Sequence, residues 1–384
     1  MKPNWGIYIH LPFCQSKCYY CDFYSHRSTE AERARYERAI LLHVERVFGQ
    51  SYGRKSPSPS TLFLGGGTPS LMDPSFLDRL MKLLRSYFQL PLDFEVTVEA
   101  NPGTLTEESL YGWVKAGCNR LSLGLQAFQP RLLRYLGRPH SSEEIVKAVE
   151  SAREKGLDNF SFDLIYGIPG QNPEDWLSTL EKVLELHPKH LSLYNLKIEE
   201  GTMFSRWQEK GLLEVVSEEI EVLMYEKAVT ILEKKGFRQY ELSNFALPGY
   251  ECRHNMNYWQ RGDYLGFGSG AVSMEGLRRW TWLQDSKRYV EAIEKGQPIP
   301  MEEEIVTALE GAEEALFLGL RRREGVDLTL LEHDFNLSTE VVQQWKKISS
   351  QLHQQGWIAY EQEKIALLPK SYLLSNEIMK RYLV

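Results

Sequence analysis

The sequence predicts an α/β protein built around a partial TIM-type barrel of six βα units, followed by a C-terminal α+β extension. Short apolar or β-branched runs alternate with helical stretches from position 6 to about 236, which is the pattern of repeated βα units. In several of the expected strands every second residue is polar, as in Tyr8 with His10 and Ser122 with Gly124. Because side chains alternate along a strand, these polar residues share one face and are expected to line the lumen of the barrel.

The expected strands lie at 6–11, 61–64, 94–99, 120–126, 161–166 and 190–196, each followed by a helix. Three of the helices have sequence signals for an N-terminus, and three have a glycine where the helix should end. The start signals are Asp73-Pro74, Ser141-x-x-Glu144 and Asn172-Pro173 with Asp175, and the stop signals are Gly117, Gly156 and Gly236.

The chain divides into three parts. The barrel is expected at 1–236, and a connecting region rich in glycine and aromatic residues follows at 237–300, where periodicity is lost. Positions 301–384 predict helices at 305–320 and 339–355 followed by a short hairpin, the order of a winged-helix-like module. Since the helix at 339–355 carries few positive charges, packing or docking of a partner is the expected role, rather than DNA reading.

Composition narrows the function classes. The chain has 384 residues, a formal net charge of −7 and a pI near 5.8, which argues against a nucleic-acid partner because phosphate contacts need a basic face. No targeting leader, lipidation signal or apolar run of about 18 residues is present, so a cytoplasmic protein is expected.

Three of the five cysteines, Cys14, Cys18 and Cys21, form a C-x3-C-x2-C motif directly after the first expected strand. A closed zinc site or a fully ligated iron–sulfur cluster needs a fourth ligand, and no fourth cysteine follows. On a 4Fe–4S cluster, three thiolates would leave one iron open for a small chelating ligand such as S-adenosylmethionine (SAM). The alternatives are a zinc site completed by His10 or His26, and three unrelated thiols.

The two remaining cysteines stand far from this motif. Cys118 and Cys252 are each expected to be an ordinary buried thiol.

Other side chains at the strand ends suit a ligand. The run Gly65-Gly66-Gly67-Thr68-Pro69 follows the second strand and lets a backbone approach closely, although a tight turn explains it as well. Glu99, Gln126 and Asp163 end three strands, and Arg138 follows the fourth. Each of these residues taken alone is explained by a hydrogen bond within the lumen. Four of them on one rim of the barrel instead indicate a bound ligand.

These motifs resemble the HemN/HemW group of radical SAM proteins, and the resemblance extends over essentially the whole chain. In this superfamily an electron from the cluster splits SAM and yields a 5′-deoxyadenosyl radical. The resemblance rests on Tyr8-x-His10, the cysteine motif, Gly-Gly-Gly-Thr-Pro, Val98-Glu99-Ala-Asn-Pro, Leu123-Gly-Leu-Gln126 and Asp163-Leu-Ile-Tyr-Gly-Ile-Pro169. It implies that Cys14, Cys18 and Cys21 bind the 4Fe–4S cluster. It implies SAM contacts from Tyr8, Tyr20, Gly66, Gly67, Thr68, Glu99, Gln126, Arg138 and Asp163.

The group has an enzyme branch and a haem-chaperone branch. In the enzyme branch the cysteine loop ends in Cys-x-Cys, and this chain has Phe23 in place of the last cysteine. Members of that branch also carry an N-terminal extension, whereas this chain begins thirteen residues before Cys14. The motif His-Asn-x-x-Tyr-Trp is typical of the chaperone branch, and this chain has it at 254–259. This implies that His254 binds haem iron while Tyr258 and Trp259 pack on the porphyrin. A histidine ligand must be neutral, so binding should weaken below a pH of about 6.5.

Two functions follow from the resemblance. The first is a haem chaperone that carries a 4Fe–4S cluster and SAM, binds haem and transfers it to haem-accepting proteins such as respiratory cytochromes. Contact with a membrane through such partners and a homodimer belong to the same expectation, and no catalytic residue is assigned. The alternative is an oxygen-independent coproporphyrinogen III dehydrogenase, which makes protoporphyrinogen IX by adenosyl-radical oxidative decarboxylation.

Overall fold

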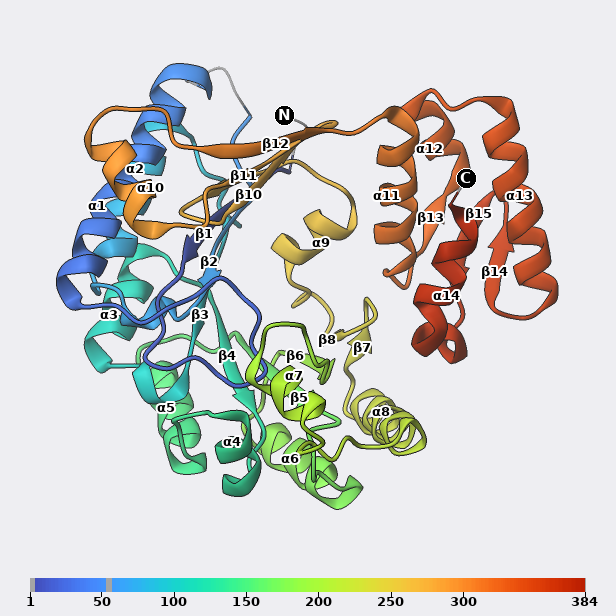
Figure 1. The fold of residues 1–384 in the computed structure, drawn as a ribbon, viewed down its shortest axis with the longest axis horizontal. Helices are drawn as coiled ribbons and strands as arrows, with labels where there is room; N and C mark the ends of the chain where they lie inside the picture. The colour runs from blue at the N-terminus through green and yellow to red at the C-terminus, as the bar shows by residue number, and fades with distance from the viewer. Residues whose placement is uncertain (1–3, 53–56, 384) are drawn as a thin grey trace.

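The computed structural model describes residues 4–52 and 57–383 and confirms the predicted partial barrel of six βα units (Figure 1). The six barrel strands pair in parallel and in chain order. They are β1 (Gly6–Leu11), β2 (Thr61–Gly66), β3 (Glu95–Ala100), β4 (Arg120–Gln126), β5 (Phe160–Tyr166) and β6 (His190–Asn195). Helices lie between them along the chain: α1 (Glu30–Val47), α2 (Phe76–Tyr87), α3 (Glu107–Ala116), α4 (Pro130–Leu136), α5 (Ser142–Glu154) and α6 (Pro173–Glu185).

Strand β4 shows why the barrel has a polar interior. Leu121, Leu123 and Leu125 belong to the main hydrophobic core and are fully buried. Arg120 and Ser122 alternate with them on the other face and line a cavity inside the barrel. The predicted alternation of apolar and polar residues therefore corresponds to the two faces of the sheet.

Most of the predicted helix ends agree with the structure. Ser141 and Asn172 each cap a helix through reciprocal hydrogen bonds with the residue three positions later. Gly117, Gly156 and Gly236 have positive φ angles of 108°, 88° and 86° at the ends of α3, α5 and α8 (Glu218–Lys234).

The start predicted at Asp73-Pro74 was wrong by two residues. Asp73 accepts a hydrogen bond from the backbone of Ser75 at 2.8 Å and forms a turn, and α2 begins only at Phe76.

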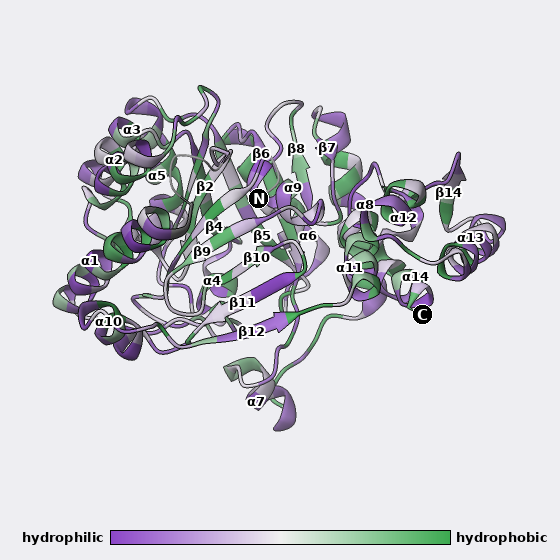
Figure 2. Cartoon of the chain, turned by 90° about the horizontal axis from the view of Figure 1, so that it is seen from above, coloured by the Kyte–Doolittle hydropathy of each residue, from purple (hydrophilic) through white to green (hydrophobic). Residues whose placement is uncertain are grey.

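The connecting region supplies strands to both edges of the barrel sheet, which has twelve strands in all within the described residues. At the β6 edge it adds β8 (Asn244–Ala246) and β7 (Arg238–Gln239), and at the β1 edge β9 (Tyr264–Phe267), β10 (Val272–Glu275) and β11 (Arg278–Trp282). The outermost strand at the β1 edge, β12 (Met301–Ile305), lies past the predicted boundary at 300 and still belongs to the barrel sheet. The short helix α9 (Arg253–Trp259) lies between these two edges (Figure 1). All five residues of β12 are exposed, and Figure 2 shows the strand in the hydrophilic colour.

The C-terminal segment forms a module with a hydrophobic core of its own. It contains α11 (Ala308–Leu320), α12 (Leu328–Phe335), α13 (Thr339–Gln354) and α14 (Ser375–Met379) with the strands β13 (Val326–Asp327), β14 (Ile358–Glu361) and β15 (Lys364–Leu367). Ile305, expected to start a helix, ends β12 instead, because Thr307 and Glu310 form the capping box that begins α11. Among the described helices, none has both the length and the apolar character needed to cross a membrane.

Candidate functional site

The cysteine loop follows β1 and lies at the C-terminal end of the barrel strands. Cys14, Cys18 and Cys21 are partly exposed, carry free thiols and line one cleft. The loop is fixed by backbone hydrogen bonds from Cys14 to His26 (3.0 Å) and from Tyr19 to Leu136 (3.0 Å). The three thiols are thus presented to a common space, as a shared cluster requires.

Most of the predicted SAM residues line the same cleft. These are Tyr20, Gly66, Gly67, Thr68, Glu99, Gln126, Arg138 and Asp163. Tyr8 does not: it lines a deeper cavity, and its hydroxyl is 2.9 Å from His10 Nδ1. Asn101, Ser122 and Gly124 also line the cleft, although none of them was predicted to contact SAM. The signals were the position of Asn101 just after Glu99 and the polar face of β4, on which Ser122 and Gly124 were expected.

The glycine run is required by packing between two loops. A Cβ on Gly67 would lie 2.6 Å from the carbonyl oxygen of Phe13 and 2.7 Å from that of Leu11. Gly67 donates to the Leu11 carbonyl at 2.9 Å and Thr68 donates to the Phe13 carbonyl at 2.8 Å. The loop after β2 therefore lies directly against the cysteine loop, which only residues without a side chain allow at this position.

Arg138 connects the cysteine loop with the ends of the strands. Its Nη1 lies 3.3 Å from Cys18 Sγ, and its Nη2 donates to Asn101 Oδ1 at 2.6 Å and to the Gly124 carbonyl at 2.7 Å. Asn101 in turn donates to Thr68 Oγ1 at 3.0 Å. The guanidinium thus places a fixed positive charge beside the thiols.

Glu99 and Asp163 are the partly buried acids of the site. Burial, and then the neighbouring Asp163, raise the pKa of Glu99 to about 8. Burial also raises the pKa of Asp163. Glu99 accepts a hydrogen bond from the Gly66 backbone at 3.1 Å, and Asp163 accepts one from Ser122 at 3.3 Å. A cationic group beside these carboxyls would favour their ionised forms.

The residues present fit a cluster and its chelating ligand. Gln126 Oε1 and Arg138 Nε, which belong to residues lining the cleft, are buried and have no hydrogen-bond partner among the described residues. Buried polar atoms of this kind are expected to be satisfied by a bound molecule or by water. Burial raises the pKa of the Cys21 thiol to about 11, so binding of iron at this sulfur would release a proton.

The zinc alternative has no support in the geometry. In the described parts of the chain, no three histidine, cysteine or acidic side chains converge to hold a single metal ion. His10 is hydrogen-bonded to Tyr8 and to the Tyr24 carbonyl, and His26 to Ser286 and the Arg27 carbonyl. A cluster has no such requirement, because each of its thiolates binds a different iron.

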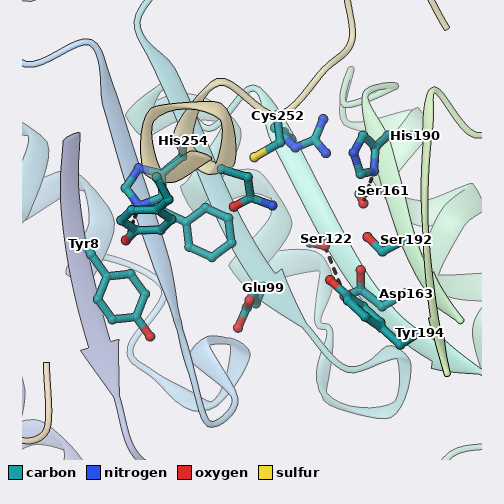
Figure 3. Close-up of a pocket in the computed structure, with 14 residues that line it drawn as sticks. Tyr8, Glu99, Ser122, Ser161, Asp163, His190, Ser192, Tyr194, Cys252 and His254 are labelled. Carbon is teal, nitrogen blue, oxygen red and sulfur yellow. Dashed lines mark hydrogen bonds between the residues drawn. The ribbon is translucent and has the colours of Figure 1, made fainter. Parts of the chain in front are cut away.

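A deeper cavity of about 290 Å³ adjoins the cleft inside the barrel (Figure 3). Glu99, Ser122 and Asp163 line both spaces. Figure 3 shows His190 and Ser192 from β6 on one side of this cavity and His254 from α9 on the other. The cleft and the cavity therefore meet at Glu99 and Asp163.

His254 lies in this cavity wall and is 1% exposed. It shares a helix face with Tyr258, as the four-residue spacing predicted, and its Nε2 is 2.9 Å from the Tyr258 hydroxyl. Its Nδ1 is 2.8 Å from Thr61 Oγ1, so neither ring nitrogen is free for iron in this conformation. Burial lowers the pKa of His254 to about 3, so titration near 6.5 was the wrong expectation for this ring.

Trp259 does not line the cavity with His254 and Tyr258. Its ring packs against the guanidinium of Arg321, 4.5 Å away in the C-terminal module, and its buried Nε1 has no hydrogen bond to the part of the chain that the structure describes. The predicted haem-binding residues are therefore divided between two environments.

Cys118 and Cys252 are buried thiols, as expected. Burial raises the pKa of each to about 12.

Comparison with known proteins agrees with these features. The family model of the radical SAM superfamily matches residues 8–183. The chain is 35% identical over 383 residues to the "Heme chaperone HemW" of Lactococcus lactis subsp. lactis (strain IL1403), covering 100% of this chain and 98% of the relative. It is 34% identical over 380 residues to the protein of the same name from Bacillus subtilis (strain 168), covering 98% of this chain and 99% of the relative.

The fold is also found in a solved structure. The coproporphyrinogen III oxidase HemN from Escherichia coli, described as a radical SAM enzyme, superposes with a TM-score of 0.84 over 99% of this chain and 90% of that chain. At 24% identity this likeness shows the shared fold alone. The relatives that match over nearly their full length show that the chain belongs to the HemN/HemW group of the radical SAM superfamily.

Proposed function

We propose that the chain is a haem chaperone that binds haem and passes it to haem-requiring proteins, and that it carries a 4Fe–4S cluster and SAM. The observation that carries this proposal is the 35% identity to a protein named as a heme chaperone, which extends over the whole chain. Phe23 supports the chaperone branch, because proteins of the enzyme branch have a cysteine at this position. Its side chain is 63% exposed and lines the cleft.

Cys14, Cys18 and Cys21 would hold the cluster, and the polar rim of the cleft would hold SAM. A reduced cluster with SAM supplies one-electron cleavage of a sulfonium. Arg138 orients the rim by binding Asn101 and the Gly124 backbone, and its charge suits a carboxylate. Glu99 and Asp163 provide carboxyl groups for an amino group or for ribose hydroxyls.

Haem ligation by His254 is the finer part of the proposal. Both ring nitrogens have partners and the ring is buried, so binding of iron requires α9 to move or the ring to turn. Tyr258 would then lose its bond to Nε2 and become free to pack on the porphyrin, together with Trp259. A cytoplasmic location, delivery to respiratory cytochromes, membrane contact through such partners and a homodimer stay predictions within this proposal.

One experiment separates this function from that of the dehydrogenase. The anaerobically reconstituted protein is given coproporphyrinogen III, SAM and a reductant in one arm, and haem followed by a haem-free cytochrome in the other. The expected result is a haem complex that transfers its haem, without formation of protoporphyrinogen IX over many turnovers. Repeated turnover to protoporphyrinogen IX would overturn the chaperone proposal in favour of the enzyme.

A further inference from the structure

Arg120 is a buried cation in the wall of the barrel cavity. It begins β4, is 2% exposed and lines the cavity of about 290 Å³. Within the described residues its guanidinium makes one hydrogen bond, from Nη1 to the Tyr250 carbonyl at 3.1 Å, and its Nε has no partner. No carboxylate of the described chain lies within ion-pair distance of it. The guanidinium therefore has unused donors and an unpaired charge.

The acids around Arg120 compensate its charge only from a distance. Glu95 binds the start of α9 instead. Its two oxygens accept hydrogen bonds from the backbone N–H groups of Arg253 and His254, each at 3.1 Å. Glu99, with a pKa of about 8, is mostly protonated at neutral pH. Asp163 has hydrogen bonds from Ser192 and Ser122, and it attracts Arg120 without contacting it.

The remaining cavity wall near Arg120 offers neutral hydrogen-bonding groups. Ser161, Ser192 and Tyr194 contribute hydroxyls from β5 and β6, and Ser161 is 2.8 Å from His190 Nδ1. Burial and the charge of Arg120 lower the pKa of His190 well below its ordinary value, so this imidazole adds no positive charge. Arg120 is thus the only permanent cation that lines the described cavity.

An unpaired charge inside a protein is unfavourable unless a partner neutralises it. The planar guanidinium matches a carboxylate, with which it forms two parallel charge-assisted hydrogen bonds. The cavity volume lies just below the ~300–1,000 Å³ typical of pockets that enclose whole drug-sized ligands. Charge and size therefore indicate a small anionic group.

We infer that the barrel cavity binds an aliphatic carboxylate, with Arg120 as its counter-charge. Ser161 and Ser192 line the cavity beside it, and their hydroxyls are shared with His190 and Asp163. Because Glu99 and Asp163 line both the cavity and the cleft, a ligand held in this way has its other end beside the SAM cleft. The carboxylate belongs either to a free small acid or to a side chain of a larger ligand. A haem propionate is the second case, and that case rests on the proposed haem-binding function.

Propionate alone is the first probe. Thermal unfolding of the full chain is followed as propionate concentration rises, with chloride at matched ionic strength as the reference. The melting temperature should rise for the wild type, and Arg120→Gln should weaken propionate binding about tenfold or more. Arg261→Gln is the matched control, since Arg261 is also a buried arginine but forms an ion pair with Glu314 (3.0 Å) and does not line the cavity.

A second variant keeps the test decisive if Arg120→Gln does not fold. Ser192→Val keeps the cation and narrows the cavity, and it should also weaken propionate binding. An equal response to propionate in the wild type and in every folded cavity variant would overturn the inference.

Haem and haem dimethyl ester, titrated in parallel, identify the source of the carboxylate. If a haem propionate enters the cavity, the ester should bind about tenfold more weakly than haem, and Arg120→Gln should abolish the difference. Equal binding of haem and ester, with an Arg120-dependent response to propionate, supports the inference with a free acid as ligand. If haem does not bind at all, the chaperone proposal fails, while the propionate titration still decides the role of the cavity.

Discussion

The guanidinium of Arg138 lies 3.3 Å from the sulfur of Cys18. A charge on the segment after β4 therefore stands beside a thiol of the loop after β1, across 120 residues of sequence. This contact joins the predicted cluster ligands to the rim of the cleft, and it leads to the first prediction.

Arg138→Met should weaken SAM binding by about 1–3 kcal/mol, because charge-assisted hydrogen bonds of this kind contribute that much. Equilibrium binding to the reconstituted protein measures the effect. Arg131→Met is the control, since Arg131 is exposed on α4 and pairs with Asp175 away from the cysteines. Equal loss of affinity in both variants would mean that the effect is not specific to the cleft.

Alanine at Cys14, Cys18 or Cys21 should abolish the brown chromophore and the bound iron and sulfide after anaerobic reconstitution. Alanine at Cys118 or Cys252 should leave all three unchanged, because these thiols are buried away from the cleft. Visible absorption and iron content provide the measurement. A Cys118→Ala protein that folds but lacks the cluster would show that the assigned ligands are wrong.

Because of Glu99, the free energy of unfolding of the unliganded protein should decrease as pH rises. The pKa of Glu99 is raised from 4.5 to about 8 in the folded chain, so its contribution to stability is complete below pH 4.5 and is lost as pH rises through 8. The difference corresponds to about 5 kcal/mol at most. Glu99→Gln is neutral at every pH and should unfold at higher urea than the wild type at pH 9, with a smaller difference at pH 5.

Urea unfolding between pH 5 and 9 tests this expectation. Glu108→Gln, which changes an exposed carboxylate on α3, should follow the wild-type pH dependence. A Glu99→Gln protein that is no more stable than the wild type at pH 9 would contradict the raised pKa.

His254→Ala should abolish specific haem binding if this ring is the axial ligand, and it should also lower stability by about 1–3 kcal/mol because Thr61 and Tyr258 lose a buried partner. Tyr258→Phe is the informative companion. It removes the hydrogen bond to Nε2 but keeps an aromatic ring, so haem affinity should stay equal or rise. Absorption titrations with haem, compared with unfolding curves, separate the two effects. Unchanged haem binding in His254→Ala would assign the ring to a purely structural role.

The barrel could be predicted from sequence because its strands are long enough to show alternation. β1 and β4 agree with the prediction to the residue, and every second residue of β4 is an apolar residue packed in the core. Most of the cleft could also be predicted, since the ends of parallel strands meet at one side of a barrel.

The connecting region could not be predicted, because its strands are too short to show a period. β7 has two residues and β8 has three, and both depend on pairing with β6 or with each other. The place of Tyr8 was missed for a different reason. Alternation identifies the face of β1 on which Tyr8 lies, but it does not show whether this side chain lines the cleft or the cavity.

The exposed strand β12 determines how the sheet meets other molecules. It is the last strand at its edge, and its sequence carries glutamates at positions 302, 303 and 304. An unpaired edge is a template for a strand from another chain, and charged side chains along it oppose such pairing. Glu303 and Glu304 form ion pairs with Arg278 and Arg279 of β11. A strand from a second copy would have to pair beside these charged side chains, so growth of the sheet from one molecule into the next is disfavoured.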